Sequence, residues 1–444
     1  MTTRRSFLKT SGACAAALGL SSALSPKVMA AMAQSAPADR VNIAVIGVGM
    51  GCADLAGMLH QPWAHCAAMC DVNSERLESQ AADFRKRFPA QTEKMQLVKD
   101  YRRVLDNKDV DGVIIATPDH WHAYIFAEAL KAGKAVYVEK PVANSIAECN
   151  LMVDLQQKYR RVVTTGLWQT SQRYFRGANE VLQTGVLGDV YKVQIFLSQT
   201  TAPRQAVPDE AAPEGFDYDT WLGPAPRRPY NSGRVRGWRG FWDYGGGQQT
   251  DWGVHWIDSA FDGLEALKLN FRTYPKAVFS TAHKHPDSFN ETPSLQTSIF
   301  RYDNFHIEWA QQPAWLYGRN QGVAWIGSRG TLVCNRDGYE LIPQLSREGK
   351  PEAQARTMTG PFEDRGLIDH TANWGECIRS GSIATNSTVE KGAFATILAH
   401  MANISFRTGT AVAYDPAARK FVNNTAADAF LKPTYRSPRQ FPQL

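Results

Sequence analysis

The feature that most constrains the fold is a strand, a glycine-rich turn and a helix in immediate succession near residue 40. Residues 40–46 form an apolar run of strand length, residues 47–52 read Gly-Val-Gly-Met-Gly-Cys, and residues 53–59 space their apolar side chains as a helix does. Glycines in such a turn let a pyrophosphate approach the backbone amides at the N-terminus of the helix. The match to G-x-G-x-x-G is imperfect, because Cys52 replaces the third glycine. The turn still predicts a dinucleotide cradle at Gly47, Gly49, Met50 and Gly51.

An acidic residue follows the second predicted strand, residues 64–70, at the distance expected for a ribose ligand. Asp71 lies 24 residues after Gly47. A carboxylate there favours the free 2′-hydroxyl of NAD and repels the 2′-phosphate of NADP. Arg76 is near enough in sequence to bind such a phosphate, so NADP remains an alternative. Asp71 could instead cap the helix that begins near residue 73.

Strands and helices continue to alternate as far as residue 166. The alternation comprises strands at 111–116, 135–138 and 162–166 and helices at 123–132 and 146–158. It predicts a doubly wound parallel sheet, an α/β Rossmann fold whose ligands bind beyond the carboxyl ends of the strands. The candidate binding residues at those ends are Thr117, Pro118, His122, Glu139 and Lys140.

A second polar motif follows three consecutive glycines at residues 245–247. Asp251, His255 and Asp258 have helical spacing, so they are predicted to lie on one face of a helix otherwise rich in Trp, Val and Ile. A lone buried histidine is usually structural. A carbinol that loses a hydride must also lose a proton to a base, however, and His255 suits that role. Lys140 can then stabilise the oxyanion or relay the proton, and Asp251 can orient the substrate.

The remaining segments of the second half are less specific. Residues 200–242 are rich in Pro, Gly, Arg and aromatics and show no regular pattern; they either stack on a sugar ring or grip another subunit. Short β-rich runs between 271 and 334 predict a meander whose exposed face packs against a second copy, which gives a homo-oligomer, a dimer or tetramer. Residues 370–379 and 391–407 are predicted to form helices that close this domain.

The first 33 residues resemble a twin-arginine export signal. Residues 3–9 read Thr-Arg-Arg-Ser-Phe-Leu-Lys, an apolar segment spans 11–24, and residues 31–33 supply small residues for cleavage. The apolar segment is too short for a stable membrane span, so a retained anchor is the weaker interpretation. The signal predicts a periplasmic protein that folds in the cytoplasm with its cofactor already bound.

Composition excludes several other classes of protein. With 43% hydrophobic and 21% charged residues, the 444-residue chain is typical of a soluble globular protein of two or three domains. The net charge of +6 is scattered, so no nucleic-acid surface is indicated. The cysteines form no CxxC pair or Cys/His cluster; we predict no metal site and no disulfides.

Four motifs together resemble the Gfo/Idh/MocA family, which includes glucose-fructose oxidoreductase and inositol dehydrogenase. They are the glycine turn, Thr117-Pro118 with His122, Glu139-Lys140-Pro141, and D-x-G-x-H-x-x-D at Asp251, Gly253, His255 and Asp258. The resemblance implies a Rossmann domain followed by an α+β domain with a large open, mostly antiparallel sheet. It also implies a nicotinamide cofactor, a sugar or polyol substrate, and Lys140, Asp251 and His255 as the catalytic group.

The sequence therefore predicts a leader at 1–33, an NAD(P)-binding domain at 40–166 and a substrate-binding and oligomerisation domain at 167–444. The predicted function is an exported NAD(P)-dependent oxidoreductase that acts on the CH–OH group of a sugar, glycoside or cyclic polyol and holds its cofactor tightly. One alternative is a redox-neutral, NAD-dependent glycoside hydrolase, which the Glu-Lys-Pro motif disfavours. A carbohydrate-binding protein without catalysis is disfavoured by the intact catalytic set. The predicted substrate-binding residues are Lys140, Trp168, Arg173, Asp251 and His255.

Overall fold

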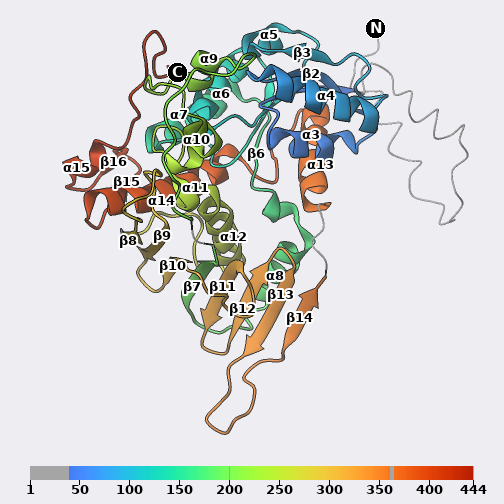
Figure 1. Ribbon diagram of the computed structural model, residues 1–444. Coiled ribbons are helices and arrows are strands. Elements are labelled where there is room, and N and C mark those ends of the chain that lie inside the picture. Colours follow the sequence, from blue (N-terminus) through green and yellow to red (C-terminus); the bar gives the residue numbers. More distant parts are fainter. Residues whose placement is uncertain (1–39, 200, 361–364, 444) are drawn as a thin grey trace, which may run out of the picture. The chain divides into compact units, whose positions relative to one another are not determined.

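A computed structural model describes residues 40–199, 201–360 and 365–443 of the chain (Figure 1). The predicted leader lies outside these ranges. Residues 41–444 form one compact unit, which contains the six-stranded and the eight-stranded sheet.

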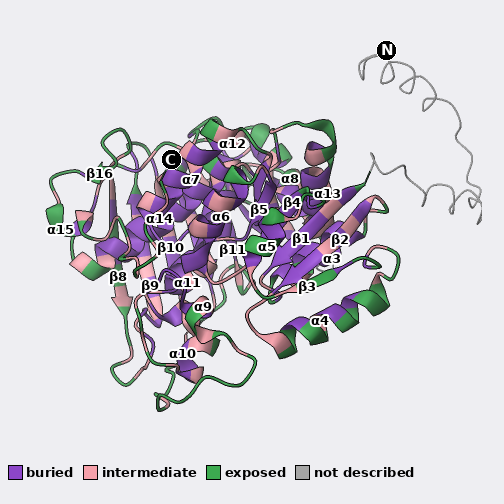
Figure 2. Ribbon diagram, turned by 90° about the horizontal axis from the view of Figure 1, so that it is seen from above, coloured by how far each residue is buried: buried purple, intermediate pink, exposed green. Residues whose placement is uncertain are grey.

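The first sheet has six parallel strands in the order β3-β2-β1-β4-β5-β6. The strands are β1 Val41–Ile46, β2 Ala64–Cys70, β3 Gln96–Val98, β4 Gly112–Ile115, β5 Ala135–Val138 and β6 Val163–Thr165. The strand order reverses between β1 and β4, which opens a crevice at their carboxyl ends. Figure 2 shows β1 and β2 buried, while α4 exposes its outer side. The predicted doubly wound parallel sheet is confirmed.

The helices of this half begin at capping residues that the sequence supplies. Asn73, Asp100 and Ser145 each accept a hydrogen bond from a backbone N–H in the first helical turn. The helices are α3 Gly51–Leu59, α4 Ser74–Arg87, α5 Tyr101–Asp106, the 3-10 turn η2 Asp119–Trp121, α6 His122–Lys131 and α7 Ile146–Tyr159.

The second sheet has eight strands in the order β14-β13-β12-β11-β7-β10-β9-β8. They are β7 Val190–Leu197, β8 Ala277–His283, β9 Leu295–Arg301, β10 His306–Gln311, β11 Gln321–Gly327, β12 Gly330–Asn335, β13 Gly338–Pro343 and β14 Arg356–Thr359. The sheet is mostly antiparallel, as expected, but it is not a simple meander. The early strand β7 lies between β10 and β11 and pairs with β10 in parallel, so it joins two antiparallel runs.

Three helices bury the inner face of the second sheet: α8 Arg173–Gln183, α12 Gly253–Ala266 and α14 Val389–Thr408. The indole N–H of Trp325 donates to the carbonyl of Ala260, 3.2 Å away, and its ring occupies space that a Cβ at Gly263 would fill. Because α14 also packs on α7 of the Rossmann half, one hydrophobic core runs through both halves. The core holds the two halves in a defined relation.

The helix predicted at 370–379 does not close the second half. It is α13 Arg365–Ser380, and it packs on α3 and buries Trp374 against the Rossmann sheet. Glycines permit this approach, since a Cβ on Gly57 would lie 3.1 Å from Thr371 and one on Gly112 would lie 3.0 Å from Trp374. The prediction was wrong because a helical pattern in the sequence does not specify which part of the fold the helix packs against.

Residues 201–242, here called the strap, are not structureless. They contain α9 Tyr218–Leu222, α10 Ser232–Arg236 and the 3-10 turn η4 Trp238–Gly240, and bury Trp221 and Leu222 in a small core of their own. The strap lies along the Rossmann half, because the Gly215 carbonyl accepts from the Ser74 amide at 3.0 Å and the Asp217 amide donates to the Val72 carbonyl at 3.0 Å.

The C-terminal segment that contains Tyr435 and Arg436, here called the C-terminal arm, contacts both the strap and α7. Arg436 donates through Nε to the Gly223 carbonyl at 3.2 Å, and the Tyr435 hydroxyl donates to Glu148 of α7 at 2.5 Å. The remaining elements are the 3-10 turn η3 Trp168–Ser171, α11 Gly247–Asp251, β15 Tyr414–Asp415, β16 Lys420–Phe421 and α15 Thr425–Asp428.

Replacing Glu148 with glutamine should remove a pH-dependent part of the stability. Burial raises the pKa of this carboxyl from 4.5 to about 7. The contribution of the protonated group is therefore fully present below pH 4.5 and lost as the pH rises to about 7, by about 3 kcal/mol. Urea unfolding of both proteins across this range measures the effect. Equal slopes of the free energy of unfolding against pH would contradict it.

Candidate active site

The glycine turn has the geometry that its sequence predicts, with one shift. Gly47 has φ 96°, and a Cβ there would lie 2.5 Å from the Ala116 carbonyl oxygen, so only glycine fits. A Cβ at Gly51 would lie 2.7 Å from Val45, which makes Gly51 the residue that lets α3 pack closely on β1. Gly51 thus serves the role of the missing third glycine, and Cys52 donates its thiol to the Val48 carbonyl.

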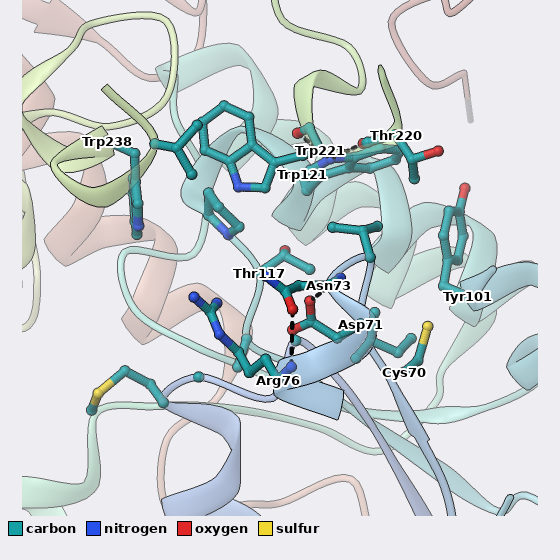
Figure 3. Close-up of a pocket in the computed structure, with 18 of the residues that line it drawn as sticks. Cys70, Asp71, Asn73, Arg76, Tyr101, Thr117, Trp121, Thr220, Trp221 and Trp238 are labelled. Atoms are coloured by element: carbon teal, nitrogen blue, oxygen red, sulfur yellow. Dashed lines mark hydrogen bonds between the residues drawn. The ribbon is translucent and has the colours of Figure 1, made fainter. Parts of the chain in front are cut away.

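A pocket of about 640 Å³ opens at the carboxyl ends of the Rossmann strands. Figure 3 shows side chains from β2, the β4 loop and the strap converging on it. All predicted cofactor residues except Gly51 line the pocket: Gly47, Gly49, Met50, Asp71, Thr117, Pro118, His122, Glu139 and Lys140. The strap closes the opposite side with Phe216, Thr220, Trp221, Tyr230 and Trp238.

Asp71 lies between the glycine turn and the start of α4. Its carboxylate accepts from the Val48 amide at 3.0 Å and from the Asn73 amide at 2.9 Å. Figure 3 shows Asp71 next to Asn73 in the pocket. The N-cap of α4 is Asn73, so Asp71 is not the capping residue. Arg76 lines the same pocket. Both the carboxylate that favours NAD and the guanidinium that NADP would require therefore face this space.

The pocket fits a dinucleotide. A Cβ at Gly49 would meet no atom within 4 Å, so the turn leaves open space in front of the N-terminus of α3, where a pyrophosphate binds. The buried Thr117 hydroxyl has no hydrogen-bond partner among the described residues, so a donor or acceptor remains available to a ligand. Gly49 and Thr117 are the residues that would hold the cofactor.

The imidazole of His122 contacts two backbone carbonyls next to the site. Its Nδ1 lies 2.8 Å from the Pro141 carbonyl and its Nε2 lies 2.8 Å from the Thr117 carbonyl. Burial lowers the pKa of the imidazole to about 4, so the neutral ring donates to one of these carbonyls. His122 therefore lies between the loops after β4 and β5, close to Lys140, and hydrogen-bonds to one of them.

Lys140 meets Asp251 across 111 residues of chain. Its Nζ lies 2.7 Å from the carboxylate of Asp251 and 2.9 Å from the carbonyl oxygen of the same residue. The Arg239 Nε lies 3.1 Å from that carboxylate. Burial alone would raise the pKa of Asp251, but the charges of Lys140 and Arg239 outweigh it and hold the pKa at about 2.

His255 lies on α12, one helix beyond Asp251. The predicted single helix is interrupted at Trp252, because α11 ends at Asp251 and α12 begins at Gly253. The rings of Trp168 and Trp252 flank the imidazole at centroid distances of 6.5 and 6.4 Å. Burial, assisted by the charge of Lys140, holds the pKa of His255 well below 6.5, so the ring is neutral at pH 7. Its Nδ1 is buried and receives no hydrogen bond from the described residues.

Two of the polar residues singled out from the sequence lie elsewhere. Asp258 forms an ion pair with Arg272 at 2.9 Å, in a buried group that also includes Asp262 and Glu265. Arg173 donates to the Tyr174 hydroxyl at 2.7 Å and lines a separate hollow beside α13. Asp258 pairs with Arg272 instead of facing Asp251, which helical spacing does not predict.

Sequence reasoning missed three residues near Lys140. Arg239 comes from the basic and aromatic end of the strap, and that composition was its only signal. Asp119 is buried, and desolvation raises its pKa well above 3.8 despite the nearby Arg239. Arg336 stacks on Trp168 and Trp252, and no local motif marks it. All three reach the site through tertiary contacts.

The described ranges, 40–199, 201–360 and 365–443, contain no group of three or more His, Cys, Asp or Glu side chains that could hold a metal ion. None of their helices has the length and hydropathy required to cross a membrane.

Two family models match consecutive parts of the chain. The NAD-binding Rossmann model of the Gfo/Idh/MocA oxidoreductases matches residues 41–167, and the C-terminal α/β domain model of the same family matches residues 176–279. The chain belongs to this family. A twin-arginine translocation signal model matches residues 1–21, which indicates export by that route.

Individual relatives agree with this assignment. A Glycosyl hydrolase family 109 protein of Shewanella baltica is 31% identical over 173 residues, which cover 36% of this chain and 38% of that protein. The chain thus matches well under half the length of these curated relatives. Among solved structures, the aldose-aldose oxidoreductase of Caulobacter crescentus has a TM-score of 0.61 at 18% identity, over 84% of this chain and 99% of that one. Levoglucosan dehydrogenase with NADH has a TM-score of 0.63 at 18% identity, over 84% and 98%. These structures share the fold of this family member.

Gly49→Ala should weaken cofactor binding without destabilising the fold. Its Cβ would enter open space and project toward the pocket, so the midpoint of thermal unfolding should not change, while NAD affinity falls roughly tenfold. Alanine at Gly47 is the matched comparison, because strain and the Ala116 contact should destabilise the fold by about 1–3 kcal/mol. Calorimetric titration with NAD and thermal unfolding measure the two effects. Unchanged NAD affinity in Gly49→Ala would contradict the assignment of the cradle.

Proposed function

We propose that the protein is an exported NAD-dependent oxidoreductase that transfers hydride between nicotinamide and a hydroxyl-bearing carbon of a sugar, glycoside or cyclic polyol. The observation that carries the proposal is the contact of Lys140, which lines the dinucleotide pocket, with Asp251: Nζ and carboxylate are 2.7 Å apart. This contact supports the proposal because it joins a cation of the pocket to the second half of the chain. NADP remains the alternative cofactor because Arg76 lines the pocket.

The proposed roles of Lys140 and Asp251 in hydride transfer follow from their charges. The cofactor, when bound, accepts or returns the hydride, and the Rossmann residues orient it. Lys140 donates a hydrogen bond to the substrate hydroxyl and stabilises negative charge that develops on its oxygen. Asp251 stays ionised, because Lys140 and Arg239 keep its pKa at about 2, and it aims the Lys140 ammonium.

His255 acts as the base in this scheme. Its pKa is held well below 6.5, chiefly by burial, so the imidazole is unprotonated at neutral pH, as a general base must be before it accepts the hydroxyl proton. Trp168 and Trp252 shield it from water and offer flat apolar faces to a sugar ring. Lys140, Trp168, Asp251 and His255 are thus proposed to bind substrate. Arg173, which lines a different hollow, is proposed only as a peripheral contact.

A redox-neutral glycoside hydrolase is the second candidate. Similarity to Glycosyl hydrolase family 109 proteins favours it, although the match covers 36% of this chain. The same base and oxyanion stabilisation would serve a sequence of oxidation, elimination and hydride return. Export adds a reason to consider it, because free NAD is scarce in the periplasm, where we place the protein. A retained cofactor that cycles between two substrates would satisfy the same constraint.

The strap supports the proposal of a tightly held cofactor. It covers the pocket with Phe216 and Trp221, and the Trp121 indole, rooted in the Rossmann half, donates to the Trp221 carbonyl at 3.1 Å. Arg436 of the C-terminal arm fastens the strap at Gly223. Release of a dinucleotide would require these contacts to open. The strap's contribution to the pocket favours this role over gripping another subunit.

A homo-oligomer, a dimer or tetramer, also remains a proposal. The outer face of the second sheet, opposite α12, exposes half of the Phe279 side chain and partly exposes Ile299. An apolar sheet face of this kind gains stability when a second copy covers it.

Methionine at Lys140 should lower kcat by about 10²- to 10⁴-fold while NAD remains bound, because it removes the cation without removing the cradle. The assay follows reduced nicotinamide and released aglycone together, with a panel of free sugars and chromogenic glycosides. Lys94→Met, at an exposed position of the Rossmann half, is the control and should match the wild type. Undiminished activity in Lys140→Met would reject the assignment. Aglycone release without net cofactor change would favour the hydrolase.

Alanine at Trp221 should accelerate cofactor release. The wild-type protein is expected to keep NAD through desalting, whereas Trp221→Ala loses the largest side chain of the strap core and should release NAD at least about tenfold faster. Absorbance at 260 nm and stopped-flow displacement measure retention. Trp315→Ala is the matched control, because Trp315 is 65% exposed in the second half. Rapid loss of NAD from the wild type would refute retention by the strap.

A further inference from the structure

Arg336 projects from a tight hairpin at the edge of the proposed substrate site. It occupies the turn between β12 and β13, where Asn335 pairs with Gly338. The Asn335 side chain accepts from the Asp337 amide at 3.0 Å and from Arg319 at 2.6 Å. The turn is thus fixed by its own side chains, and Arg336 is a preorganised group on a rigid element.

A chain of hydrogen bonds ties Arg336 to the helix of His255. Its Nε donates to Gln169 Oε1 at 3.0 Å, and Gln169 Nε2 donates to Ser259 Oγ at 2.8 Å. The Ser259 hydroxyl in turn donates to the His255 carbonyl at 3.0 Å. These bonds keep the guanidinium in a constant position relative to the proposed base.

The guanidinium lies among three indole rings. Its Cζ is 4.7 Å from the ring centroid of Trp168, 4.9 Å from that of Trp252 and 6.0 Å from that of Trp256. Trp168 and Trp252 are also the rings that flank His255. Arg336 and the proposed base therefore share the same aromatic walls.

Arg336 forms no ion pair within the described part of the chain. Asp251, Asp337 and Glu139 favour its charged form electrostatically, but no described carboxylate lies within ion-pair distance of it, and Gln169 is the one side chain among those residues to which it donates. Arg272, by contrast, is surrounded by three carboxylates, and Arg239 pairs with Asp251. Cation–π contacts offset only part of the cost of withdrawing a guanidinium from water. Burial lowers its pKa to about 10, which leaves it charged at neutral pH.

We propose that Arg336 receives a carboxylate of the substrate, so that the site takes a sugar acid. The inference rests on the proposed function, since it names the substrate class of the same site. A planar carboxylate matches the fork of the two terminal guanidinium nitrogens and can bind it with two parallel hydrogen bonds. The indoles cover the apolar face of the sugar ring, and the hydroxyl to be oxidised faces Lys140 and His255.

Calorimetric titration of the NAD-loaded protein tests the proposal without turnover. The probes are D-glucuronate and D-galacturonate, each compared with its neutral hexose. At least one acid should bind about 10- to 100-fold more tightly than its neutral partner. Equal affinities, no binding of either acid, or tighter binding of glucose 6-phosphate than of the acids would overturn it.

Substitutions then assign the preference to one residue. Arg336→Met should abolish the preference for the acid, and Arg336→Lys should keep only part of it, since an ammonium lacks the planar fork. Arg347→Met removes an exposed arginine of the loop between β13 and β14 and should bind as the wild type does. If Arg336→Met does not fold, a wild-type preference in Arg336→Lys overturns the proposal, as does a preference retained in Arg336→Met.

The two proposals fail in different ways. Binding of a sugar acid that depends on Arg336, without reduced nicotinamide from any substrate, would support the carboxylate site and refute the proposed function. Reduction of neutral sugars at a rate that Arg336→Met does not change would support the proposed function and overturn the carboxylate site. The calorimetric and the kinetic readouts are therefore both required.

Discussion

The short contact between Lys140 and Asp251 is the interaction on which the arrangement of the site depends. It joins the loop after β5 to the end of α11, and Arg239 of the strap adds a second cation to the same carboxylate. The pair is partly buried, and withdrawing two charges from water costs free energy. The contact therefore depends on neighbouring structure that holds both groups in place. His122 lies close to the lysine on one side, and the shared core of α12, α14 and α7 fixes the other.

Local patterns predicted most of the first half because its structure is largely local. The strand at 135–138 matches β5 residue for residue, and the glycine turn lies between β1 and α3 as expected. The role of Gly51 was not predictable, since it depends on contact with Val45 and Ala116 on other strands. The motif therefore located the glycine turn, whereas tertiary packing determined which glycine allows the close approach of α3 to β1.

The second half was predicted less completely because its decisive features are non-local. No periodicity places β7 between β10 and β11, or α13 against α3. Helical spacing put Asp258 beside His255, yet Arg272 attracts it into a buried ion network. Arg336 carries no motif, because its importance comes from three indoles and a glutamine that meet it only in the folded chain.

The balance of charge around His255 links these features. Lys140, Arg239 and Arg336 are cations, whereas Asp251 is the nearby carboxylate whose pKa is lowered. Desolvation raises the pKa of Asp119 and of Glu139, which disfavours their charged forms. The charges of Lys140 and Arg336 assist burial in keeping His255 neutral. The same two cations would attract the anionic substrate proposed for Arg336. Binding of a carboxylate at Arg336 would in turn reduce the positive charge near His255 and raise the basicity of the imidazole once the substrate is in place.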